Sequence, residues 1–441
     1  MNFLKKSFCC LFSLMLTGCS ISINVDTMLT PPKLSGEQEQ IYQALQEAAG
    51  SDIRLKYPKS GSYLSAFIIA DIDNDAGEEA IVFYEKNSAS GLRINILDKI
   101  DGRWQSICDR SAEGSEIEKV MISQLGSSDR MNIIVGYSTA NQSEKYLSVY
   151  AYENNYLEQP LTHSYALFDV ADTGGTHPDL ILLGAVSTAE PAYAAVYRLA
   201  EDDRYHEYKF QFTDNYTDYQ QLSYGKLSDD RIALYVDAAT GTANLQTEIL
   251  CLESSADADS DTETDIRLVN LLQRCGKSAE ETIRRAGLAS MDIDNDNIPE
   301  IPVQRVFRGY ESAPESEQIR QTDWLKMQDN QIFTEYESYY SINDGYLFIL
   351  PEQWQKHVTV INNMTENEIQ FCAYDADEPE TLPVLLRIYI AYDDADRNDH
   401  LHAGYQLLHT KGTASYLVKT EPGEELSVST GEILLCFQFS D

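Results

Sequence analysis

The sequence predicts an all-β propeller built from at least five similar blades, followed by a small C-terminal α+β domain. The passages "AFIIADIDNDAGEEAIVFYE", residues 66–85, and "LASMDIDNDNIPEIPVQRVF", residues 288–307, both place aspartates at alternate positions between two apolar runs. Between them, short apolar runs recur at roughly the 45–65-residue spacing that four-stranded propeller blades require. After residue 343 the pattern changes, which predicts a second domain.

The N-terminal residues match a bacterial export signal. Lys5 and Lys6 form a positive region, and residues 8–16 form an apolar stretch too short to span a bilayer. The following "LTGC" resembles the lipobox of bacterial lipoproteins. The resemblance implies a signal peptide over residues 1–18 and a lipid on Cys19, which would anchor the mature protein stably at the extracellular face of the cell membrane. An ordinary signal peptide with a chance cysteine is the alternative.

A tether and a short helix are predicted over residues 19–59. Ser35 fits the N-cap of the helix, and Ile41, Leu45 and Ala48 fall on one helical face. Because a single apolar stripe must be buried, the helix is expected to pack on the next domain.

The propeller repeats are predicted to occupy residues 60–343. Each repeat consists of an apolar run, a polar loop and a second apolar run, and the five loops begin at Asp71, Gln124, Asp169, Lys226 and Asp292. The unit resembles the FG-GAP/VCBS repeat of integrin-type β-propellers, in which a D-x-D-x-D-G-x-x-D loop joins two strands. The whole chain is also similar to lipoproteins of Gram-positive bacteria that carry such repeats.

The number of blades stays open at this point. Integrin heads have seven blades, whereas five FG-GAP-like repeats are legible here. A five-bladed ring, a larger ring closed by segments such as residues 52–58, and an incomplete stack are the three alternatives.

The alternate aspartates are the expected metal ligands, and calcium is the expected ion. Carboxylates held at close range repel one another unless a cation lies between them, and Ca²⁺ takes six to eight oxygen ligands. The ligands predicted in the first loop are Asp71, Asp73, Asp75 and Glu79. Those predicted in the fifth loop are Asp292, Asp294, Asp296 and Glu300. The alternative is a polar turn without an ion.

These two loops are not EF-hands. The glutamate that an EF-hand needs at position twelve is replaced by Val82 and Val303, and the flanking residues are strand-like. The glycine that the FG-GAP motif has at its sixth position is replaced by Ala76 and Asn297. Asparagine tolerates a positive φ angle, whereas alanine does so poorly.

The other three loops have lost part of this ligand set. The second loop has no carboxylate at a ligand position. The third keeps Asp169, Asp172 and Asp179 at altered spacing, and the fourth begins with Lys226, which would repel a cation.

The last segment, residues 344–441, is predicted to form the α+β domain. Alternating apolar runs such as "VLLRIYIAY" and "EILLCFQF" favour strands. A sixth and seventh blade is the alternative.

The charge balance and the cysteines limit the functional classes. With 33 basic and 71 acidic residues, the formal net charge is −38, which argues against binding nucleic acid or anionic lipid by charge. The five cysteines beyond Cys19 are not a disulfide framework, although Cys251 with Cys275, or Cys372 with Cys436, could pair.

The motifs favour a binding protein over an enzyme. The sequence contains no nucleophile elbow, HExxH, P-loop or dinucleotide fingerprint. The motif "HLH" at His400 and His402 could bind a transition metal, but an exposed loop is the expected context. We therefore expect a surface module for binding or adhesion, with a protein or glycan ligand. The alternative is an extracellular hydrolase, carbohydrate-active, with its site in the propeller funnel.

The lipobox generates the first prediction. Cys19→Ser should block acylation and processing, because the thiol is the acyl acceptor, and should leave a precursor held only by its uncleaved signal. Detergent partitioning and the mass of the N-terminal peptide measure this. Mature protein that still enters the detergent phase in this variant would show that the lipobox assignment is wrong.

Overall fold

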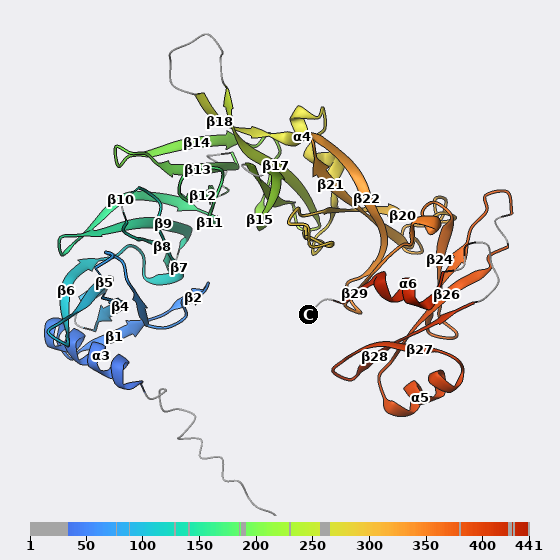
Figure 1. Ribbon diagram of the computed structural model, residues 1–441, viewed down its shortest axis with the longest axis horizontal. Coiled ribbons are helices and arrows are strands. Elements are labelled where there is room, and N and C mark those ends of the chain that lie inside the picture. The colour runs from blue at the N-terminus through green and yellow to red at the C-terminus, as the bar shows by residue number, and fades with distance from the viewer. Residues whose placement is uncertain are drawn as a thin grey trace, which may run out of the picture. The chain divides into compact units, whose positions relative to one another are not determined.

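The structure is a computed structural model that describes residues 34–75, 77–87, 89–127, 129–139, 142–184, 186, 191–228, 231–255, 265–378, 381–421, 426 and 428–439 (Figure 1). The predicted signal peptide, Cys19 and most of the tether lie outside these residues, as does Ala76. Within the described residues, no helix is long and apolar enough to cross a membrane.

Six sheets, dominated by antiparallel pairs, and four α-helices make up the described part of the chain. This confirms the prediction of an all-β protein built from a succession of small sheets. The chain divides into two compact units, of which the first holds the helix α3 and the first sheet and the second holds the other five sheets.

In the first unit, α3 covers the first sheet. The helix spans Gly36–Ala49 and begins in a capping box, in which Ser35 and Gln38 each bind the other's backbone amide. Its buried face carries Ile41, Ala44 and Leu45, whereas Ala48, expected on this face, is exposed. The sheet consists of β1 (Ile53–Lys56), β3 (Phe67–Ala70), β4 (Glu79–Lys86), β5 (Ala89–Ile100) and β6 (Arg103–Ser111).

The segment 52–58, considered above as a possible ring closure, supplies β1 to the first sheet and Pro58 to the second. Its strand β1 pairs with one half of β4, and β3 pairs with the other half of the same edge. Both pairings are antiparallel. Because β5 pairs with the other edge of β4, β4 is the central strand of the first sheet.

The second unit begins with two sheets that follow the repeat pattern. The second sheet consists of β2 (Pro58–Ser60), β7 (Glu116–Ser123), β8 (Asn132–Thr139), β9 (Gln142–Glu153) and β10 (Tyr156–Tyr165). The third consists of β11 (Leu167–Ala171), β12 (Asp179–Leu183), β13 (Tyr193–Leu199) and β14 (Tyr205–Gln211). The β2–β7 pair is parallel.

Two short helical segments pack on the fourth sheet. It consists of β15 (Asp218–Ser228), β16 (Arg231–Thr240), β17 (Asn244–Ser255), β18 (Asp265–Asn270) and β19 (Arg284–Arg285). The helix α4 (Leu271–Arg274) and the 3₁₀ helix η1 (Ala279–Thr282) follow β18 and pack on β17.

The fifth and sixth sheets complete the second unit. The fifth consists of β20 (Ile301–Val306), β21 (Arg320–Gln328), β22 (Gln331–Ser341), β23 (Tyr346–Ile349) and β29 (Phe437–Phe439). The sixth consists of β24 (Val358–Asn363), β25 (Glu368–Ala373), β26 (Val384–Ala391), β27 (Gln406–Lys411) and β28 (Ala414–Thr420). The short helices here are η2 (Glu352–Trp354), α5 (Asp394–His402) and α6 (Thr430–Leu435).

The predicted boundary between residues 343 and 344 falls in the turn between β22 and β23. These two strands pair, and β23 also pairs with β29 from the end of the described chain. The fifth sheet therefore contains strands from both sides of the predicted boundary, while the sixth sheet with α5 and α6 supplies the mixture of strands and helices expected of the C-terminal region.

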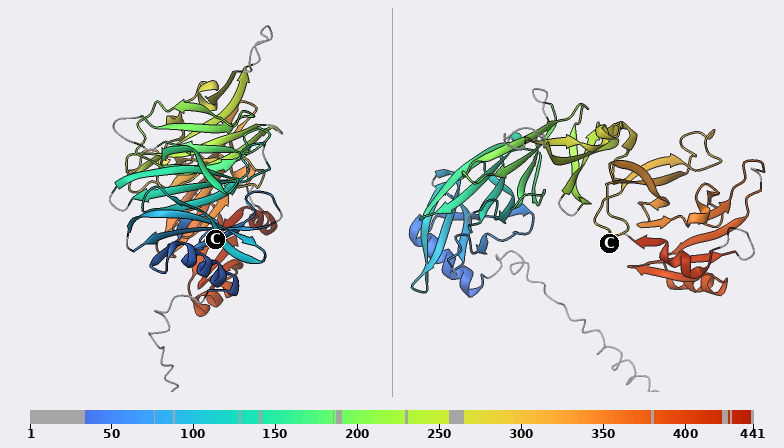
Figure 2. Two further views of the ribbon diagram at one scale, coloured as in Figure 1. Left: turned by 90° about the vertical axis from the view of Figure 1, so that its left-hand side faces the viewer. Right: turned by 45° about the horizontal axis from the view of Figure 1, so that its top comes forward.

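Apolar side chains hold neighbouring sheets of the second unit together. One buried cluster joins the second and third sheets, another the third and fourth, another the fourth and fifth, and another the fifth and sixth. The succession from the cyan to the red sheets can be followed in the right-hand view of Figure 2. Strands that are buried on both faces of their sheet, such as β12 and β16, read as near-continuous apolar runs.

The five described cysteines form no disulfide bonds with one another, so neither of the two possible pairs is present. Burial raises the pKa of the Cys251 thiol and raises the pKa of the Cys372 thiol to about 11. These cysteines serve as small packed side chains.

A buried ion pair fixes the end of the fourth sheet. Arg284 Nη2 lies 2.7 Å from Asp237 Oδ1, and both side chains are at most 1% exposed. Arg284 also donates to Thr247 Oγ1 at 2.8 Å, and Asp237 accepts from the amide of Ser290 at 2.7 Å. Burial lowers the pKa of Arg284, and Asp237 opposes this shift. The cost of burying the charges of Arg284 and Asp237 is thus offset by their ion pair and by these hydrogen bonds.

The second prediction compares two adjacent arginines. Arg284→Ala should lower the free energy of unfolding by about 3–5 kcal/mol, because it leaves the buried carboxylate of Asp237 without its counter-ion. Arg285→Ala is the matched control; its contact with Glu315 is exposed and 3.5 Å long, so the loss should stay below about 1 kcal/mol. Urea denaturation measures both values. Equal losses would contradict the structural role of the pair.

Candidate functional site

The first acidic loop joins β3 to β4 and brings three of its four predicted ligands together. One carboxylate oxygen from each of Asp71, Asp73 and Glu79 lies within 4.8 Å of the other two. Glu79 is the first residue of β4 and is 1% exposed. Asp75 is outside this group, and its Oδ1 accepts the amide of Gly77 at 2.7 Å, so it shapes the turn.

The fifth acidic loop has the same arrangement. Oxygens of Asp292, Asp294 and Glu300 lie within 4.8 Å of one another, and Glu300 is buried just before β20. Asp296 is again outside the group. Its Oδ1 accepts the amide of Ile298 at 2.8 Å, as Asp75 does in the first loop. The two loops therefore share one geometry.

Asparagines supply the left-handed backbone that the loops need. Asn74 and Asn295 have φ angles of 60° and 61° at equivalent positions, and Asn297 has a φ of 69°. This confirms the expectation that Asn297 can replace the glycine of the motif, because asparagine adopts this conformation with little strain.

A lysine that the sequence did not predict lies among the carboxylates of the fifth loop. Lys326 Nζ is 2.9 Å from Asp294 Oδ2, 2.6 Å from Asp296 Oδ2 and 3.1 Å from Glu300 Oε1. Burial alone would lower the pKa of Lys326, but the hydrogen bonds to the three carboxylates outweigh it, so the pKa is raised. The ammonium group is therefore charged.

The same environment shifts the pKa values of Glu300 and Asp294 in opposite directions. Burial raises the pKa of Glu300 to about 7, although the amide of Ile293 and Lys326 act against this. For Asp294, burial is outweighed by Lys326 and by the hydroxyl of Tyr336, which donates at 3.0 Å, so its pKa is lowered.

Arg198 on β13 lies beside the third loop, as Lys326 lies beside the fifth. Arg198 donates to Asp179 through Nε at 2.9 Å and Nη2 at 2.7 Å, and Thr173 also donates to this carboxylate. Asp179 is 1% exposed, so the fork of Arg198 compensates a buried charge. Asp169 contacts Lys119 at 3.2 Å, and Asp172 accepts the amide of Gly174.

The loops differ in how well they fit a metal ion. The three converging oxygens of the first loop are hard ligands suited to Ca²⁺ or Mg²⁺. In the fifth loop, Lys326 already contacts three of the carboxylates. Among the described residues, these two loops are the clusters of His, Cys, Asp and Glu that could hold a metal. His400 is instead stacked on Tyr389 at 3.7 Å, with Nδ1 3.1 Å from Asp396.

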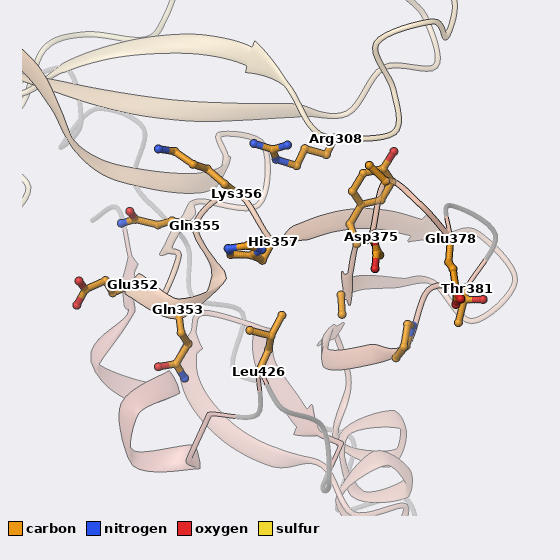
Figure 3. A pocket seen from close by; sticks show the side chains of 14 residues that line it. Arg308, Glu352, Gln353, Gln355, Lys356, His357, Asp375, Glu378, Thr381 and Leu426 are labelled. Atoms are coloured by element: carbon orange, nitrogen blue, oxygen red, sulfur yellow. The ribbon is translucent and has the colours of Figure 1, made fainter.

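A separate pocket of about 1100 Å³ lies between the end of β20 and the sixth sheet (Figure 3). Lys356 and Gln355 lie on one side of His357, and Asp375 and Glu378 on the other. The complete lining is Arg308, Glu352, Gln353, Gln355, Lys356, His357, Ala373, Tyr374, Asp375, Ala376, Glu378, Thr381, Pro383 and Leu426.

Hydrogen bonds to backbone carbonyl groups frame this pocket. The amide of Tyr374 donates to His357 O at 2.9 Å, and Thr359 Oγ1 donates to Arg308 O at 2.6 Å. The indole of Trp354 donates to Leu426 O at 2.6 Å. The polar lining is consequently presented from a fixed main chain, with amides, both signs of charge, an imidazole and a phenol ring.

Comparison with known proteins gives little guidance. No protein-family model matches the chain, and no curated protein matches it. The chain resembles an exotype rhamnogalacturonan lyase, YesX, with a TM-score of 0.30 and 12% identity over 76% of this chain, and spans 65% of the length of that lyase. It also resembles a hypothetical protein from Leishmania major, with a TM-score of 0.18 and 9% identity over 65% of this chain and 89% of that chain.

The third prediction concerns the arginine of the third loop. Arg198→Met should lower the free energy of unfolding by about 3 kcal/mol, because it leaves the buried carboxylate of Asp179 uncompensated. Adding Asp179→Asn should restore much of this loss. A double-mutant cycle in urea measures the coupling; additive losses would mean that the pair does not interact energetically.

Proposed function

We propose that the protein is a lipid-anchored surface module that binds a glycan, with successive sheets as the blades of a calcium-stabilised β-propeller. The lipobox at Cys19, the FG-GAP-like repeats and the absence of catalytic motifs in the sequence support this proposal. The observation that carries the binding function is the framed polar pocket beside the sixth sheet.

Calcium stabilises the loop between β3 and β4 in this proposal. Asp71, Asp73 and Glu79 would hold the ion, and bound calcium would neutralise their charge and join the ends of the two strands. An ion that binds only the folded state raises the free energy of unfolding by mass action. We assign the ion a structural role because it would join the ends of β3 and β4.

The chemistry of the pocket favours a glycan. Planar groups such as the amides of Gln353 and Gln355, the guanidinium of Arg308 and the carboxylate of Asp375 can pair with neighbouring hydroxyl groups. Tyr374 and Leu426 add apolar surface for the faces of sugar rings. Acids outnumber bases in the lining, with Glu352, Asp375 and Glu378 against Arg308 and Lys356, so the pocket favours a neutral glycan.

The fourth prediction tests this binding with the chain from residue 20 onward on an array of neutral, uronate-bearing and sulfated glycans. The chain should bind neutral glycans, and Arg308→Ala should weaken binding about tenfold or more, the effect of losing one charge-assisted hydrogen bond. Arg204→Ala, at an exposed site outside the pocket, is the matched control. Binding that is equal in both variants would exclude the pocket as the site.

The same assay separates binding from hydrolysis. Asp375 and Glu378 place two carboxylates in the pocket, which is the group that a glycoside hydrolase would use. A bound glycan recovered intact, with no new reducing ends, is expected of a binding module. Release of reducing ends that Asp375→Asn abolishes would favour the hydrolase.

A further inference from the structure

In each repeat, the position where the second strand begins faces one residue of the third strand. The second-strand residues, with the fifth immediately before its strand, are Glu79, Asn132, Asp179, Arg231 and Glu300. Ala151 pairs with Asn132 in the recorded register. Continuing the other registers by one residue places Asp98, Arg198 and Lys326 opposite Glu79, Asp179 and Glu300, and continuing by two residues places Glu253 opposite Arg231. Residues directly opposite on antiparallel strands project from the same face, so their charges interact.

The charges at this position differ between the repeats in a regular way. The third and fifth repeats pair an acid with a base, at 2.7 Å for Asp179–Arg198 and 3.1 Å for Glu300–Lys326. The fourth repeat reverses the signs, with Arg231 Nη2 2.9 Å from Glu253 Oε1. The second repeat is uncharged here. Only the first repeat, among the five, places two acids opposite each other.

From this comparison we propose that Lys326 is the built-in counter-ion of the fifth loop and closes that loop to divalent cations. The proposal rests on the ion sites of the proposed function and changes their number. The alternate aspartates of this loop are suited to an external cation, and the ammonium group of Lys326 takes the place of that cation.

The contacts of Lys326 explain why an ion is excluded. Its ammonium group lies within 3.1 Å of oxygens of Asp294, Asp296 and Glu300. A calcium ion would take the same oxygens at about 2.3–2.6 Å, so the two cations would share ligands and repel each other at short range. The lysine side chain is only 5% exposed, so it has no nearby position in water to which it could retreat.

The first loop lacks such a base at the equivalent position. Continuing the register of β4 and β5 by one residue places the acid Asp98, and not a base, opposite Glu79. Like charges directly opposite one another are destabilising. An external cation at the first loop would therefore meet no base at this position, in contrast to the third and fifth loops.

Counting bound calcium tests this proposal. Native mass spectrometry and calorimetric titration of the chain from residue 20 onward would be carried out at about 1 mM calcium, where extracellular calcium modules bind. Lys326→Met, which keeps the length of the side chain but removes the charge, should bind one ion more than the wild type. Its melting temperature should then rise with calcium. Lys326→Arg keeps a cation and should leave the count unchanged.

A second variant protects the test against a failure of Lys326→Met to fold. Asp98→Lys introduces a base into the first loop and should remove one ion from the wild-type count. Ala151→Lys makes the same change in the second repeat and should leave the count unaltered.

An equal ion count in the wild type and Lys326→Met would overturn the proposal, as would an equal count of one or more in the wild type and Asp98→Lys. A wild-type count of zero with one ion in Lys326→Met would support the role of Lys326. It would contradict the calcium ion that the proposed function places in the first loop. The two failures are therefore distinguishable.

Discussion

The repeats depend on one electrostatic constraint. Each acidic loop turns the chain between two strands by directing carboxylates toward a common centre, and one of these carboxylates is buried in the second strand. A buried carboxylate is expensive unless a positive charge compensates it. In the third and fifth repeats the compensating charge is covalently part of the chain, as Arg198 and Lys326. In the first repeat the opposite residue is Asp98, so the chain itself supplies no base at that position.

This constraint connects the loops to the sheets around them. Lys326 belongs to β21, so its contacts join the fifth loop to the middle of the fifth sheet. Ser290, two residues before Asp292, donates its amide to Asp237 in the buried network with Arg284, which joins the same loop to the fourth sheet. The fifth loop is thus held from both sides by charge, while apolar clusters join the sheets themselves. Loss of Lys326, or of the Arg284–Asp237 pair, would affect both the fifth loop and the packing of the fourth and fifth sheets beside it.

Much of this arrangement could be predicted from local sequence patterns, because strands, capping residues and turn residues act over a few positions. The strands, the helix capped by Ser35, and the convergence of Asp71 with Asp73 and Asp292 with Asp294 are of this kind. Asp75 and Asp296 lie outside the two carboxylate clusters and each accepts a backbone amide, and alternate spacing alone does not show which carboxylate will do so. Lys326 lies 26 positions beyond Glu300 and Arg198 lies 19 beyond Asp179, and only the strand register brings each pair together. The pocket also depends on segments that are distant in sequence.

The central claim is that a cation within the chain and a cation from solution are alternatives at equivalent positions of the repeats. The most direct measurement is anomalous diffraction from crystals grown in calcium, because it locates each ion. The account predicts a peak between Asp71, Asp73 and Glu79, and no peak beside Lys326, whose ammonium group keeps its contacts with Asp294 and Glu300. A peak in the fifth loop with Lys326 displaced, or two peaks of equal height in the two loops, would contradict it.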